Sequence, residues 1–262
     1  EALALGPLIL PPFVGAIGVT QLFGQYGAVN SVLVALGLSD PGNGPDWLSD
    51  HRFAAVCILE ALHLYPILYL ATAASLTRLD GSLLEAAQLM GAGSWTRFRR
   101  IVLPLIRPGL FGGGIVVFVW SFTELGTPLM LGYDRVTPVQ IFNGLLELDS
   151  NPLPFALVVI LLAISLALYL VARLVFLRRH DAMASKHAGL WIPLRLHGWR
   201  GWCAAGAVGL IVALAIAPHA AVLLIAVSGS WYGTVLPASL TIRHINDALA
   251  HPAVVPGGMN SV

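Results

Sequence analysis

Charged side chains are scarce in this sequence. Only 10% of its 262 residues are Asp, Glu, Lys or Arg, whereas 57% are hydrophobic. Soluble domains usually carry about 25% charged residues, so this chain has too few charges to cover a surface that faces water. It also lacks a basic run of the kind that follows a phosphate backbone, which argues against nucleic acid as a partner. These absences predict a membrane protein.

Other expected signals of chemistry are also missing. The two cysteines, Cys57 and Cys203, lie in separate apolar runs and form no CxxC pair, so we interpret them as small core residues rather than as a disulfide or metal site. No glycine-rich loop followed by Lys and Ser or Thr occurs, so we expect no ATP hydrolysis and no cofactor in this chain. The sequence starts inside an apolar run without a leader pattern and stops at 260–262, where another run is expected to begin, so we interpret it as part of a longer protein.

Long apolar runs are what the sequence has. A membrane-crossing helix needs about 20 apolar residues, and five segments qualify: 2–23, 53–74, 108–131, 155–177 and 202–227. Prolines inside them are tolerated because neighbouring helices satisfy the freed backbone groups. The predicted fold class is therefore all-α, a polytopic transmembrane helical bundle with about five spans. Buried helices of a soluble protein are the disfavoured alternative, since the run 155–177 carries a single charge.

The basic residues predict the orientation of the bundle. Most of the 14 Lys and Arg residues fall in two segments, 75–107 and 173–200, whereas acidic residues prevail in the other loops. Because loops rich in Lys and Arg stay in the cytoplasm, we expect both segments inside. Five crossings then place residue 1 inside and residue 262 outside.

Segment 75–107 predicts two short helices. Ser82 followed by Glu85 is a capping-box pattern that begins the first helix. Gly91 is placed to end that helix in a left-handed turn. One stripe of the helix carries three apolar residues at helical spacing: Leu83, Ala87 and Met90.

Ser94 is predicted to cap the second helix of this segment, and Pro104 is predicted to stop it. One side of it carries Trp95, Phe98 and Ile101 or Val102. Two short helices joined by a glycine turn form a compact knob that suits docking into a cleft. The alternative is a plain loop whose helices pack back on the bundle.

The spacing of seven residues in this segment resembles the signature loop of ABC importer permeases, E-A-A-x3-G-x9-I-x-L-P. The seven are Glu85, Ala86, Ala87, Gly91, Ile101, Leu103 and Pro104. In that family, which has the MetI-like fold, the loop docks in a groove of a cytoplasmic ATPase subunit. The resemblance implies that the first four residues form the docking knob and that the last three set its exit into the next span.

Partners and location also follow from the resemblance. It implies a binding-protein-dependent importer in the cytoplasmic (inner) membrane of a prokaryote, surrounded by lipid, rather than an enzyme. A dimer of ATPase subunits uses the ATP, and a periplasmic or lipid-anchored solute-binding protein delivers the solute. The spans then alternate between outward and inward access.

The wider sequence resembles the iron(III)-type permeases, in which two homologous halves are fused. The similar stretches are 64–70, 98–109 and 122–128. On this resemblance 1–177 supply the last four spans of the first half, 178–201 form a cytoplasmic linker, and 202–262 supply the first span and an outer segment of the second half. Ferric iron is then the implied solute. Polyamine, thiamine and phosphonate permeases share the loop and stay open as alternatives.

Three ionisable residues lie inside the predicted spans: Glu60, His63 and Glu124. A charged group at the bilayer centre costs at least roughly 2.5–3.5 kcal/mol, so such residues face an interior or a water path. One hypothesis is that they line the translocation path. The alternative is a buried hydrogen-bonded network, or a protonated Glu, that braces the bundle.

Two other classes of membrane protein could use the same residues. A secondary transporter or channel would need the spans and the carboxylates but not the cytoplasmic knob. An intramembrane enzyme would use Glu60 and His63 as acid and base, but the sequence places no nucleophile or complete metal set beside them.

Overall fold

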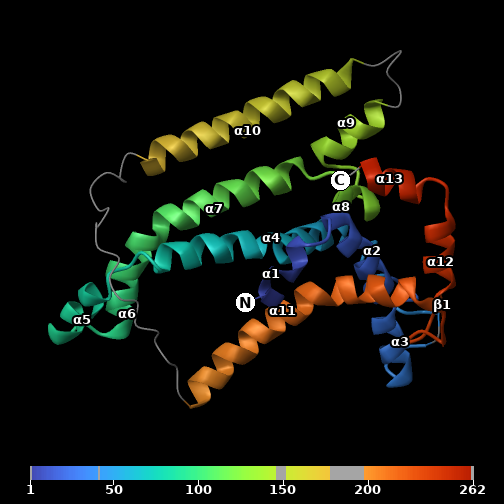
Figure 1. The fold of residues 1–262 in the computed structure, drawn as a ribbon, viewed down its shortest axis with the longest axis horizontal. Coiled ribbons are helices and arrows are strands. Elements are labelled where there is room, and N and C mark those ends of the chain that lie inside the picture. The colour runs from blue at the N-terminus through green and yellow to red at the C-terminus, as the bar shows by residue number, and fades with distance from the viewer. Residues whose placement is uncertain (1, 41, 146–151, 178–197, 261–262) are drawn as a thin grey trace. The chain divides into compact units, whose positions relative to one another are not determined.

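A computed structural model describes residues 2–40, 42–145, 152–177 and 198–260 (Figure 1). Helices dominate these residues, which confirms the all-α prediction. Most of the predicted linker 178–201 lies outside the described residues.

The elements follow one another along the chain with short connections. They are α1 (Ala2–Leu5), the 3-10 turn η1 (Gly6–Leu8), α2 (Pro12–Phe23), α3 (Ala28–Ala35), α4 (Arg52–Leu76), α5 (Gly81–Leu89), α6 (Ser94–Arg97), the π turn η2 (Phe98–Val102), α7 (Leu103–Thr123), α8 (Gly126–Met130), α9 (Thr137–Leu145), α10 (Leu153–Leu177), α11 (Trp199–Ala226), β1 (Ser228–Ser230), β2 (Ser239–Leu240), α12 (Arg243–Ala250) and α13 (Val254–Asn260).

Four helical stretches of the described chain are long and apolar enough to cross a membrane. They are Arg52–Leu76, Ser94–Thr123, Leu153–Val171 and Gly201–Ala226. The predicted spans 53–74, 155–177 and 202–227 are confirmed to within a few residues. Prolines inside α4 and α11 leave both helices continuous.

The first predicted span, 2–23, is not one helix. Pro11 has an extended backbone, with φ −58° and ψ 147°, and α2 starts only at Pro12. Proline removes a backbone donor and disfavours the helical conformation of the residue before it, so two in succession interrupt the run. At 1.5 Å per residue, the 12 residues of α2 reach only about 18 Å, short of the roughly 30 Å hydrocarbon core.

The third predicted span, 108–131, is wrong at both ends. Its helix begins at Ser94 and ends at Thr123, where Glu124 turns extended. Pro104 does not stop the second loop helix as predicted. Just before it the backbone widens into the π turn η2, whose end is closed by the Leu103 N–H donating to the Phe98 carbonyl. In a π turn each N–H pairs with the carbonyl five residues back instead of four. This shift before Pro104 lets the helix continue through a residue that has no N–H to donate.

The chain divides into two compact units. One comprises Glu1–Leu62, Gly126–Tyr133 and Leu210–Val262, and the other comprises His63–Leu125 and Asp134–Gly209. The predicted boundaries at 177 and 202 concern the two permease halves and stay a prediction.

The first unit holds a buried apolar cluster. Its members come from α2, α4 and the residue that follows α8: Ala16, Val19, Val56, Leu59 and Leu131. On the same helix α2, Gly18 lies against α11 so closely that a Cβ atom there would fall on the carbonyl oxygen of Pro218. A glycine therefore sets how closely α2 and α11 approach.

The second unit packs α7 against α4 and α10. A Cβ added at Gly113 would lie 2.7 Å from the Cβ of Ala71, whereas its neighbours Gly112 and Gly114 have nothing within 4 Å. Only the middle glycine of this triplet is thus required by packing. Small residues at membrane helix contacts let backbones approach closely.

The prediction that Cys57 and Cys203 are core residues is wrong, since both are exposed and free. An apolar residue on a membrane helix faces lipid as readily as it faces protein. The apolar residues around each cysteine in the sequence therefore did not show whether it faces lipid or the protein interior.

Candidate functional site

The segment between α4 and α7 begins with a capped helix, but not with the predicted cap. Asp80 is the N-cap of α5, and its side chain accepts a hydrogen bond of 2.9 Å from the Ser82 N–H. Ser82 therefore lies inside the first turn, and the predicted Ser82–Glu85 capping box is wrong. Asp is as good an N-cap as Ser, and the helix begins one residue after the carboxylate.

The end of α5 is as predicted. Gly91 adopts the left-handed conformation, with φ +82°. The Ala92 N–H donates to the Ala87 carbonyl and the Gly91 N–H to the Gln88 carbonyl, both at 2.9 Å. These two bonds form a Schellman motif, which satisfies the free carbonyls at the end of a helix. The glycine turn of the knob is thus confirmed.

A polar contact joins the two sides of that turn. Arg97 of α6 donates from Nη1 to Oε1 of Gln88 in α5 over 2.6 Å, and from Nη2 to the Ser94 hydroxyl over 3.3 Å. Ser94 is the first residue of α6 rather than its cap, since Gly93 occupies the N-cap position without a side-chain bond. That part of the prediction is wrong.

The apolar side chains of the knob are mostly exposed. Of the predicted stripe only Ala87 is buried, whereas Leu83 and Met90 are exposed. Leu89 and Met90, at the turn, are 89% and 83% exposed. On the second helix Trp95 stacks on Phe98 with ring centroids 5.6 Å apart, and both rings stay exposed. We call Leu83, Leu89, Met90, Trp95 and Phe98 the knob patch.

The predicted exit residues lie where the knob joins α7. Ile101 belongs to η2, and Leu103 and Pro104 open α7. Ile101 and Leu103 are half-buried and Pro104 is exposed. The π turn thus connects the knob to the span without a break in the helix.

Glu60 and His63 lie one turn apart on α4. Both side chains are buried, each 6% exposed. Burial agrees with either hypothesis for them, a water path or an internal network. Glu124 lies at the C-cap of α7 and is half-buried. The sequence placed it within a span, but it stands at the end of one.

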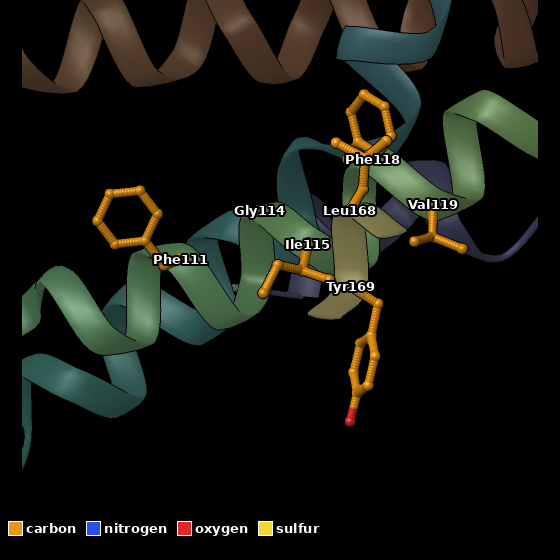
Figure 2. A pocket seen from close by; sticks show the side chains of 7 residues that line it. All are labelled: Phe111, Gly114, Ile115, Phe118, Val119, Leu168 and Tyr169. Carbon is orange, nitrogen blue, oxygen red and sulfur yellow. The ribbon is translucent and has the colours of Figure 1, made fainter. Parts of the chain in front are cut away.

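An apolar groove lies between α7 and α10 (Figure 2). It is lined by Phe111, Gly114, Ile115, Phe118, Val119, Leu168 and Tyr169. Apart from the Tyr169 hydroxyl these side chains offer no ligand to a charged solute, so this groove is not a candidate solute site.

One contact was not anticipated from the sequence. Arg52, at the start of α4, donates from Nη1 to the Gly132 carbonyl over 2.7 Å, just beyond α8, where Gly132 has φ +64°. Nearby, Phe53 packs on Tyr133 with ring centroids 5.7 Å apart. The available signal was that Arg52 is one of few basic residues outside the two basic segments.

The loop before α4 is ordered by an acidic side chain. Asp46 accepts from the backbone N–H groups of Ser49 and Leu48 at 3.1 and 3.2 Å. The hydrogen bond from Ser49 is the main cause that holds the pKa of Asp46 below its usual value.

Apolar helices of membrane-crossing length, joined by a knob with exposed apolar side chains, define a multi-pass membrane protein. The chain belongs to the binding-protein-dependent transport system inner membrane component family, whose sequence model matches residues 3–180. Its domain is that of a MetI-like ABC permease.

The names of two groups of similar proteins refer to different solutes. The ferric transport system permease protein FbpB of Actinobacillus pleuropneumoniae is 32% identical over 127 residues, 48% of this chain and 18% of that protein. The molybdenum transport system permease protein ModB of Mycobacterium bovis is 31% identical over 180 residues, 67% of this chain and 61% of that protein. The chain thus spans less than two thirds of the length of these relatives. No solved structure matches it.

Proposed function

We propose that this chain is the membrane-spanning part of an ABC importer, in which the knob of residues 75–107 docks on a separate cytoplasmic ATPase dimer. The observation that carries the proposal is the knob patch. Its apolar side chains are exposed on a segment that the distribution of Lys and Arg places in the cytoplasm. A cluster of exposed apolar residues on a water-facing segment is typical of a protein interface.

The signature residues would have two kinds of role: some would contact the ATPase, and the others would hold the shape of the knob and link it to α7. Glu85 and Ala86 are exposed on α5 and would contact the ATPase, whereas Ala87 is buried and shapes the knob from within. Gly91 would set the angle between α5 and α6. Ile101, Leu103 and Pro104 would transmit the motion of the knob to α7 through the continuous helix.

Reversing the charge of Glu85 tests the docking role. We expect Glu85→Arg to lower co-purification of the ATPase subunit at least about tenfold, a loss of about 1.4 kcal/mol, because the new cation would be placed in the contact. The measurement is the amount of ATPase recovered with the affinity-tagged full-length permease from solubilised membranes.

Asp134→Arg is the matched control, since Asp134 is an exposed carboxylate in a predicted outer loop. It should leave ATPase recovery unchanged. Full recovery of the ATPase with both variants, together with normal stimulated ATP hydrolysis, would refute docking through this knob.

The proposed solute is ferric iron, with molybdate as the alternative that the second group of relatives supports. Polyamines, thiamine and phosphonates remain further alternatives. A solute-binding protein would deliver the solute to the outer segments 25–52 and 132–153. Alternating access driven by the ATPase would then release it inside, which makes this chain a permease rather than an enzyme.

Within the spans we propose that Glu60, His63 and Glu124 line the solute path. We expect Glu60→Gln and Glu124→Gln each to reduce uptake at least about tenfold, near 1.4 kcal/mol in the transport barrier, because each removes a charge and keeps the shape. Uptake of radiolabelled ferric iron and of molybdate into membrane vesicles is the measurement.

Asp247→Asn is the control for these two variants, since this carboxylate of α12 is exposed and lies outside the two outer segments; it should transport normally. ATPase recovery should also stay normal, which separates a defect in the path from a defect in docking. A lower thermal stability with unchanged uptake would instead identify the carboxylates as a brace within the bundle.

A further inference from the structure

α12 is amphipathic and its apolar side is uncovered. Ile242, Ile245 and Leu249 fall on one side at helical spacing and are 66%, 41% and 64% exposed. Arg243 and Asp247 lie on the opposite side, where Nε of the arginine is 3.5 Å from the carboxylate. A helix divided in this way, with its apolar residues exposed, needs a covering surface.

The start of α12 is tied to the end of a membrane span. The strands β1 and β2 pair antiparallel directly after α11, with Ser228 opposite Leu240. The Thr241 N–H then donates to the Val227 carbonyl over 2.8 Å. Nε2 of His244 lies 3.1 Å from the Ser228 carbonyl. Val227 directly follows the last residue of α11, and Thr241 lies two residues before the first residue of α12. The hydrogen bond between them therefore holds the start of α12 beside the end of the span.

The direction of α12 also differs from that of the span. In Figure 1 the red helix α12 runs across the line of the orange end of α11 instead of continuing it. A helix at the end of a span that turns away from the span's axis does not continue the crossing.

Aromatic residues mark the same level. Tyr232, in the hairpin loop, stacks on Tyr26 with ring centroids 4.7 Å apart, and Gln21 donates to the Trp231 carbonyl over 2.9 Å. Tyr and Trp are enriched where a membrane meets water. The loop that carries them connects α11 with α12.

We propose that the apolar side of α12 rests in the lipid interface at the C-terminal end of α11, the outer side according to the distribution of Lys and Arg. The covering surface is acyl chain and headgroup rather than protein. The tether at Thr241 and His244 makes the contact intramolecular, so an eight-residue helix suffices where a free peptide of this length would not bind. The paired charges of its polar side give no net attraction to anionic lipid.

Spin labels on the two sides of α12 test this proposal. Single cysteines replace Ile245, Leu249, Arg243 or Asp247 in the full-length protein, with Cys57 and Cys203 changed to alanine. Each variant is reconstituted in phosphatidylcholine vesicles with and without phosphatidylglycerol. We expect the labels at 245 and 249 to lie about 5–10 Å into the headgroup and acyl boundary, accessible to oxygen and shielded from a water-soluble nickel chelate.

The labels at 243 and 247 should show the reverse accessibility, and phosphatidylglycerol should leave the depths at 245 and 249 unchanged, since both of these variants keep the charge pair. Equal exposure of all four labels to the nickel chelate would overturn the proposal, since α12 would then stand in water. Shielding of 245 and 249 from both oxygen and nickel would overturn it as well, because protein would then cover this side. All four positions are exposed, so each label should be tolerated by the fold.

Discussion

Gly18→Ala is expected to lower the thermal unfolding midpoint of the detergent-solubilised protein by about 6–12 °C. The added Cβ would fall on the carbonyl oxygen of Pro218 and lie only 2.5 Å from its carbonyl carbon. Backbone cannot rotate aside as a flexible side chain can, so α2 and α11 must move apart. Overpacking of this kind destabilises by about 3 kcal/mol at the upper end of its usual range, and each kcal/mol shifts the midpoint by about 2–4 °C for a domain of this size.

Gly112→Ala is the matched control because nothing lies within 4 Å of its position in α7. An alanine there should be neutral or stabilise by up to about 1 kcal/mol, since glycine is the poorer helix former. Equal midpoints for the two variants would show that α2 and α11 do not approach each other as closely as the structure has them.

The second large effect is expected at the turn of the knob, where Gly91→Val should abolish coupling to the ATPase. Gly91 has φ +82°, a conformation that costs a residue with a Cβ roughly 1–2 kcal/mol and a β-branched residue more. The Schellman turn would open and the angle between α5 and α6 would change. The measurements are ATPase recovery with the tagged permease and ATP hydrolysis stimulated by the binding protein in proteoliposomes.

Gly93→Val supplies the control two residues away. Gly93 has φ −64° and ψ 161°, an extended backbone that valine adopts, and nothing lies within 4 Å of it. Its ATPase recovery should stay close to that of the unchanged protein. If both variants coupled normally, the left-handed turn would have no part in docking, although the knob patch itself could still carry the contact.

The local predictions in the knob succeeded where a single residue type decides the backbone. Gly91 was predicted from its place after an apolar stripe and confirmed, because a positive φ excludes nearly every other residue. The caps failed, since Asp80 and Ser82 are both good N-caps two residues apart and the pattern does not choose between them. Pro104 failed for a different reason: the π turn before it removed the conflict that normally ends a helix at proline.

The apolar runs predicted spans better than span boundaries. The run 155–177 carries no competing signal and was predicted within two residues. The run 108–131 joined two elements, because hydrophobicity continues past Thr123 while the backbone turns at Glu124. Nothing in the composition of residues 94–107 showed that the helix of the knob continues into the span.

The sequence by itself determined that this is a multi-pass membrane protein and that residues 75–107 carry a permease signature. Both depend on composition and on spacing along the chain. Only the tertiary structure decided which side of each helix is covered: that Gly18 and Gly113 are contact residues while Gly112 is not, that Cys57 is exposed, and that α12 leaves an apolar side open. In a membrane, lipid and protein interior are equally apolar, so hydrophobic patterning alone does not separate a buried side from an exposed one.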